Sequence, residues 1–65
     1  MANGILYWES ETTHMREIIV EMCGWRNKSG KATPMGKRIA RTPWNQLSTA
    51  ARNVLLNHGI QEKAL

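Results

Sequence analysis

The chain lacks most of the devices that usually stabilise a very small protein. It has 65 residues and a single cysteine, Cys23, so no disulfide can form within it. A domain of this size buries only about 60% of the surface of its unfolded chain and is therefore marginally stable. A lone thiol is typical of a reducing compartment. We therefore expect one small cytoplasmic domain over residues 1–65.

Long apolar segments are missing as well. The longest apolar run is residues 5–8, Ile-Leu-Tyr-Trp, whereas a membrane-spanning helix needs about 20 apolar residues. The N-terminus also lacks the basic region and long apolar stretch of a signal peptide. These absences predict a soluble intracellular protein with no membrane partner.

Acidic residues are scarce over most of the chain. Residues 1–21 hold four glutamates against one arginine, but residues 22–61 hold no acid and seven basic residues, and the whole chain carries +4. This uneven distribution creates a positive field that attracts phosphate backbones, acidic protein surfaces or anionic lipids. The simpler alternative is a solvated surface that keeps a small protein in solution.

Two segments have the pattern of amphipathic helices. Residues 13–23 follow a capping threonine, Thr12 or Thr13, and end at Gly24. Residues 43–58 follow Thr42, with Pro43 at the first helical position, and end at Gly59; a break with a new start at Ser48 is the alternative. The side chains predicted to pack these helices together are Met15, Ile18, Ile19, Met22, Leu47, Ala51, Val54 and Leu55.

The remaining segments predict a strand and a connector. Residues 5–8 are rich in β-formers and are typical of a short strand or apolar arm, which needs a partner strand from this chain or from another copy. The second option predicts a homodimer through residues 5–8. Residues 26–42 form a basic connector with a short helical turn near Lys37–Arg41. The fold class is therefore mostly α, a two- to three-helix domain with a short N-terminal strand or arm.

No pattern in the sequence indicates catalysis or a cofactor. The stretch from Gly24 to Thr33 resembles a phosphate-binding P-loop, but five residues separate its glycines and Ala32 follows Lys31, so nucleotide hydrolysis is not expected. Lys28–Lys31 could still form an exposed anion-binding turn.

His14, Cys23 and His58 lack the paired spacing of a metal site, and a cysteine on an apolar helix face is inert. We expect no enzyme, no metal and no cofactor.

One helical segment resembles a known family. Residues 47–60, LSTAARNVLLNHGI, resemble the opening helix of the C-terminal domain found in the bacterial RNA polymerase alpha subunit, with matches at Leu47, Ser48, Asn53, Leu55, Gly59 and Ile60. The resemblance implies that Asn53 lies on a surface that contacts the DNA minor groove. The family's arginine position is Ala50 here, and Arg52 lies two residues away.

A second resemblance concerns the order of the elements. A strand followed by two helices is similar to the ribbon-helix-helix repressors, whose DNA-binding ribbon comes from a dimer. Residues 5–8 offer no polar side chains that could read bases, so this remains a minor alternative.

The function that these observations favour is a small, basic, non-enzymatic nucleic-acid-binding or transcription-associated regulator. The alternative is a small inhibitor of the kind that viruses or plasmids encode, which binds an acidic face of a host protein. The residues predicted to contact the nucleic acid or acidic protein are Arg26, Lys28, Lys31, Lys37, Arg38, Arg41, Arg52 and Asn53.

Overall fold

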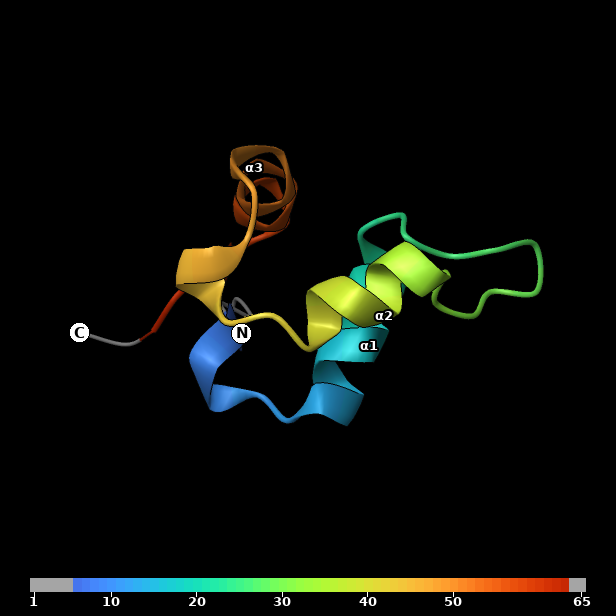
Figure 1. The fold of residues 1–65 in the computed structure, drawn as a ribbon, viewed down its shortest axis with the longest axis horizontal. Coiled ribbons are helices and arrows are strands. Elements are labelled where there is room, and N and C mark those ends of the chain that lie inside the picture. The colour runs from blue at the N-terminus through green and yellow to red at the C-terminus, as the bar shows by residue number, and fades with distance from the viewer. Residues whose placement is uncertain (1–5, 64–65) are drawn as a thin grey trace, which may run out of the picture.

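The computed structural model describes residues 6–63 and confirms the predicted mostly α fold with a short N-terminal strand. The helices pack as a small cluster, with a long loop projecting from one side (Figure 1). The elements in chain order are β1 Leu6–Tyr7, the 3₁₀ helix η1 Trp8–Ser10, α1 Thr13–Met22, α2 Pro34–Ala40, the 3₁₀ helix η2 Trp44–Gln46, α3 Thr49–Asn57 and β2 Ile60–Gln61.

Helix α1 begins and ends close to the residues that the sequence predicts. The hydroxyl of Thr12 accepts a hydrogen bond from the backbone N–H of Met15 at 3.2 Å, which caps the first turn. Gly24 adopts a positive φ of 112°. The N–H of Gly24 bonds to the Glu21 carbonyl, and the N–H of Trp25 folds back to the Val20 carbonyl at 2.9 Å. This pair of bonds is a Schellman motif, which satisfies carbonyls that the helix end would leave free.

The buried face of α1 differs from the predicted one. Val20 is fully buried and Ile19 nearly so, but Ile18 is 36% exposed and Met22 70% exposed. Met15 is exposed as well. The predicted packing was therefore wrong for Met15, Ile18 and Met22, because α2 packs against α1 on the side of Val20.

The predicted connector contains a true helix. Thr33 caps α2 by accepting a hydrogen bond from the N–H of Gly36 at 3.1 Å, and Pro34 occupies the first turn. Proline is favoured there because its fixed φ suits a helix and its missing N–H would have no partner in any case. The sequence predicted only a short helical turn near Lys37–Arg41, whereas the helix begins at Pro34 and runs to Ala40.

The last helix is shorter than the predicted 43–58. Residues 44–46 form η2, and Leu47 is extended, with φ −71° and ψ 149°. Helix α3 then begins at Thr49, with the Ser48 hydroxyl accepting from the N–H of Ala51 at 3.1 Å. The start at Pro43 was wrong, and the alternative start at Ser48 is confirmed.

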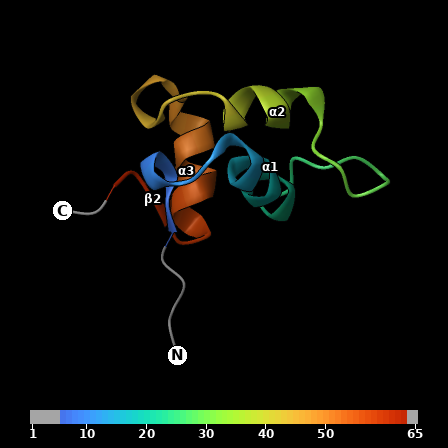
Figure 2. The same ribbon diagram turned by 90° about the horizontal axis from the view of Figure 1, so that it is seen from below.

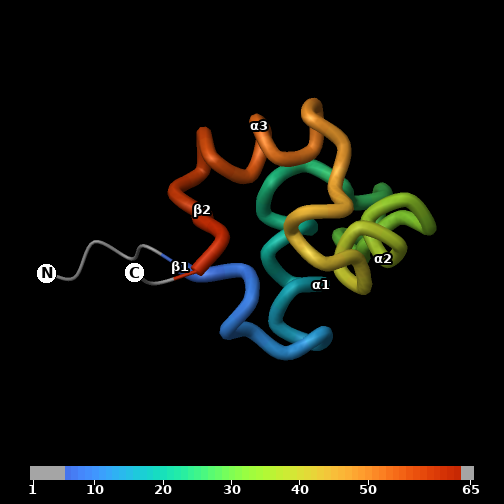
Figure 3. Tube along the Cα trace, turned by 60° about the vertical axis from the view of Figure 1, so that its left-hand side comes forward, coloured from blue at the N-terminus to red at the C-terminus, as the bar shows by residue number. Residues whose placement is uncertain are grey.

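The N-terminal strand finds its partner within the chain. Strand β1 pairs in parallel with β2, with Leu6 opposite Ile60 and Tyr7 opposite Gln61, and Figure 3 shows the two segments side by side. This pairing satisfies one edge of β1 within the chain. The homodimer through residues 5–8 and the ribbon-helix-helix alternative, which needs a ribbon made from two copies, gain no support from it and stay predictions. Ile5 of the predicted strand lies outside the described residues.

Trp8 fastens the N-terminal segment to the rest of the fold. Its ring is fully buried, and its indole N–H donates to the Thr42 carbonyl at 2.9 Å. The Arg16 guanidinium lies 5.1 Å from the centre of this ring, and its Nε donates to the Trp8 carbonyl. The Glu9 carboxylate accepts from the N–H of Trp44 at 2.8 Å. These contacts hold the N-terminal segment and the segment around Trp44 against one core. The buried members of this core are Trp8, Ile19, Val20, Ala32, Ile39, Trp44, Leu47, Ala51, Leu55 and Ile60.

Candidate functional site

Residues 26–32 form a protruding loop with a defined backbone path. Arg26 and Ala32 make an antiparallel bridge at its base, and the N–H of Asn27 donates to the Lys31 carbonyl at 2.8 Å. The N–H of Gly30 donates to the Asn27 carbonyl at 3.0 Å. We call this segment the 26–32 loop; Figures 1 and 2 show it extending away from the helices.

The side chain of Asn27 organises the tip of this loop. Its Oδ1 accepts from the N–H of Ser29 at 3.0 Å, from the Ser29 hydroxyl at 2.7 Å and from the N–H of Lys31 at 3.1 Å. The N–H groups of Ser29, Gly30 and Lys31 therefore all have partners inside the loop. An anion-binding turn uses free backbone N–H groups, and three of the four in the predicted turn at Lys28–Lys31 are already bonded. Attraction of an anion to this loop would therefore depend mainly on the basic side chains.

Helix α2 presents a basic outer face beside the loop. Lys37, Arg38 and Arg41 are exposed, whereas Gly36 and Ile39 face the protein interior. The N–H of Thr33, just before the helix, donates to the Trp25 carbonyl at the base of the loop, at 3.1 Å. This bond ties the loop and α2 into one unit.

Six of the eight predicted site residues lie on this unit, and all six are exposed. We call them the basic surface: Arg26, Lys28, Lys31, Lys37, Arg38 and Arg41. The guanidinium of Arg26 is held in place, since its Nη1 donates to the Glu21 carbonyl at 2.9 Å.

The other two predicted residues lie elsewhere. Arg52 is half-buried and Asn53 is exposed, and both belong to α3. Figures 1 and 3 show α3 apart from the 26–32 loop and α2. The structure therefore does not bring Arg52 and Asn53 to the basic surface.

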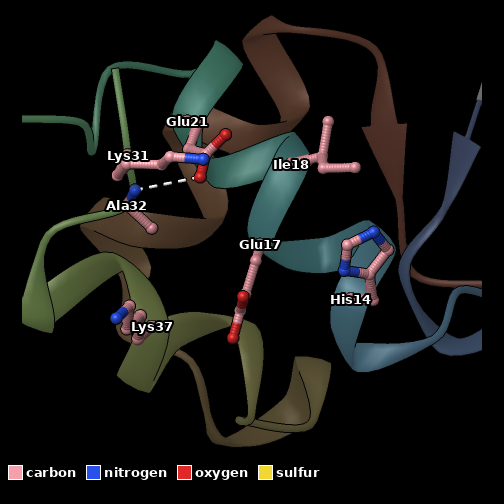
Figure 4. Close-up of a pocket in the computed structure, with 7 residues that line it drawn as sticks. All are labelled: His14, Glu17, Ile18, Glu21, Lys31, Ala32 and Lys37. Carbon is pink, nitrogen blue, oxygen red and sulfur yellow. Dashed lines mark hydrogen bonds between the residues drawn. The ribbon is translucent and has the colours of Figure 1, made fainter. Parts of the chain in front are cut away.

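Acidic residues of α1 border one side of the basic surface. Lys31 and Lys37 line a cleft of about 410 Å³ together with Glu17 and Glu21 (Figure 4). The Glu21 carboxylate accepts from the N–H of Ala32 at 2.9 Å, so it also anchors the loop to α1. The charge segregation seen along the sequence is consequently less complete in space. The members of the basic surface that do not line this cleft are Arg26, Lys28, Arg38 and Arg41.

A second, smaller hollow is mostly apolar. It has a volume of about 170 Å³ and is lined by Leu6, Ile19, Met22, Cys23, His58 and Ile60. Burial raises the pKa of the Cys23 thiol, which lowers the thiolate fraction and hence the reactivity at neutral pH. The Nδ1 atom of His58 lies 2.9 Å from the Val54 carbonyl, so this nitrogen carries the proton.

Within residues 6–63 no group of three or more His, Cys, Asp or Glu side chains is placed to hold a metal ion.

Two residues of the site were missed from the sequence. Asn27 is the organiser of the loop, and the sequence Asn27-Lys28-Ser29-Gly30 has the composition of a tight turn, which could have revealed it. Met35 is 52% exposed in the first turn of α2, before Lys37 and Arg38. Nothing in a single sequence marks Met35 as exposed rather than buried, because its helix was not predicted.

Comparison with known proteins gives no match: no family model fits the chain, and neither a characterised protein nor a solved structure is significantly similar to it. The resemblance of residues 47–60 to a helix of RNA polymerase therefore stays a prediction. Among the described residues, no helix has the length and apolar character required to cross a bilayer.

Proposed function

We propose that the protein binds nucleic acid through the basic surface and acts as a small non-enzymatic regulator. The observation that carries the proposal is the convergence of six exposed cations on one loop-and-helix unit whose backbone is fixed by hydrogen bonds. Clustered lysines and arginines neutralise phosphates and release counterions, which is the main source of sequence-independent affinity for nucleic acid.

The salt dependence of binding tests the proposal. If about four phosphates are neutralised, log K should fall with log salt at a slope of roughly −3.6. The variant Lys37→Ala/Arg38→Ala removes two cations of the basic surface and should flatten this slope by up to about 1.8. Its thermal unfolding should stay close to that of the wild type, because both side chains are exposed.

The variant Arg52→Ala/Lys63→Ala is the matched control. It removes the same number of charges, but Arg52 lies on α3 and Lys63 follows β2. Its salt slope should remain near that of the wild type. Equal effects of the two variants would show that net charge, rather than the basic surface, determines binding, and would contradict the proposal.

A protein partner is the second candidate, and one observation favours it. Met15, Ile18 and Met22 form an exposed apolar stripe on α1, at helical spacing. Apolar anchors of this kind dominate the affinity of protein interfaces. A small inhibitor would combine this stripe with the basic surface against an acidic protein. Absence of nucleic-acid binding at low salt, together with a single protein recovered from a nuclease-treated lysate, would favour this function over the first.

A further inference from the structure

We infer that the nucleic acid is duplex DNA and that the outer face of α2 enters one of its grooves through Met35 and Arg38. The inference rests on the proposed function and adds the class of partner and the contacting residues. Two independent observations carry it: the position of the aromatic side chains and the exposure of Met35.

None of the aromatic side chains is fully exposed, as a platform for stacking on unpaired bases would be. The chain has three tryptophans, one tyrosine and no phenylalanine. Trp8 and Trp44 are buried in the core, and Trp25 is half-buried and packed against it beneath Gly36. Tyr7 lies in β1, across the molecule from α2 (Figure 3). Proteins that bind single strands rely on exposed aromatic platforms, so the basic surface is better suited to a duplex, whose bases are already stacked.

The outer face of α2 is not purely basic. Met35 is 52% exposed and lies three residues before Arg38, on the same face of the helix. A surface that contacts only phosphates gains nothing from an apolar side chain, whereas apolar contacts to thymine methyl groups or base steps are made within DNA grooves. Lysine and arginine can flank such a contact by binding the phosphates on either side.

The dimensions of α2 agree with entry into a groove. An α-helix with its side chains is about 10–12 Å wide, close to the roughly 12 Å width of the major groove of B-DNA. The seven residues of α2 span only about 10 Å, so few side chains can reach the base edges. The 26–32 loop extends beyond α2 (Figure 2). It carries the exposed Lys28, which we expect to meet the adjacent backbone. In A-form RNA the major groove is too deep and narrow for such contacts.

The test compares four probes of one sequence: the DNA duplex, each separate DNA strand, and the corresponding RNA duplex. We expect the DNA duplex to bind about tenfold more tightly than the other probes at the same salt concentration. Equal binding of the strands and the duplexes would overturn this inference but leave the proposed function intact. Absence of binding to every probe would overturn both.

Two matched variants test the groove contact directly. Met35→Ala should weaken binding to the DNA duplex about threefold to tenfold while leaving the salt slope unchanged, because no charge is removed. Leu56→Ala is the control, since Leu56 is 50% exposed but lies on α3; it should bind like the wild type. If Met35→Ala binds the duplex as tightly as Leu56→Ala, α2 does not enter a groove and the inference is overturned.

Discussion

Gly36 lies so close to Trp25 that a β-carbon at this position would be 2.9 Å from both the Cβ and the carbonyl oxygen of Trp25. Val20 would be 3.3 Å away through its Cγ2 atom. The contact joins α2 to the end of α1 and to the base of the 26–32 loop. It therefore fixes the position of the helix that bears half of the basic surface.

This contact predicts that Gly36→Ala destabilises the protein. Alanine is the better helix former by about 1 kcal/mol, but overpacking against the backbone of Trp25 should cost about 1–3 kcal/mol. We expect a net loss of about 1 kcal/mol, which corresponds to a fall in Tm of roughly 4–8 °C for a domain of this size. Thermal unfolding followed by circular dichroism measures it. The neighbouring Met35→Ala, at an exposed position, should leave Tm nearly unchanged, and a Gly36→Ala protein as stable as that control would contradict the close approach.

Two nearby positions of α1 test the orientation of the helix. Val20 is fully buried, whereas Ile18 is 36% exposed. Val20→Asp places an unpaired carboxylate in the core, at a cost of several kcal/mol, against a total stability of about 3–10 kcal/mol. We expect Val20→Asp to be unfolded at 25 °C and Ile18→Asp to give a helical circular dichroism spectrum close to that of the wild type. If only the Ile18 variant unfolds, Ile18 rather than Val20 lies on the buried face of α1, as the sequence predicted.

The helix ends were more predictable than the helix faces. Capping by Thr12, termination at Gly24 and the alternative start at Ser48 depend on residues within one turn, so a single sequence contains the necessary information. The buried face of α1 depends instead on the segment that packs against it. The sequence pattern favoured Ile18, but α2 and Trp8 cover the side of Val20 and Arg16.

The candidate site was predictable in its residues but not in its shape. The exposure of Arg26, Lys28, Lys31, Lys37, Arg38 and Arg41 could be expected from their charge alone, and their role in binding stays a prediction. Their arrangement depends on hydrogen bonds that connect the loop to its flanking helices, such as Thr33 to Trp25 and Ala32 to Glu21. The same tertiary arrangement separates Arg52 and Asn53 from the others, although the sequence grouped them with the rest.

The Cys23 thiol predicts a pH dependence of stability. Burial raises its pKa above the ordinary value for cysteine, so the folded state favours the protonated thiol. This contribution is fully present below the pKa of the unfolded chain, about 8.5, and is lost as the pH rises through the pKa of the folded state. We expect the free energy of unfolding to fall as the pH rises above about 8.5. In Cys23→Ala the part of this fall that comes from the thiol should be absent. Alkylation by iodoacetamide at pH 8 should also be slower in the folded protein than in urea; equal rates would contradict the burial.

The last prediction concerns Asn27, whose side chain gives the 26–32 loop its shape. Asn27→Ala removes the acceptor of three hydrogen bonds, from the Ser29 N–H, the Ser29 hydroxyl and the Lys31 N–H. Each such bond contributes about 0.5–1.5 kcal/mol to local order. A loosened loop must be ordered again when it binds, which lowers affinity without any change in charge.

We therefore expect Asn27→Ala to bind nucleic acid about threefold to tenfold more weakly, with an unchanged salt slope. Faster hydrogen exchange at the Ser29 and Lys31 amides, measured by NMR, should accompany the loss. Ser29→Ala is the control, because it removes only the 2.7 Å hydroxyl bond and keeps both backbone bonds to Asn27; it should bind nearly as the wild type does. Faster exchange in Asn27→Ala without any loss of affinity would mean that the shape of the loop is irrelevant to binding. In that case Lys28 and Lys31 would act only as freely moving charges.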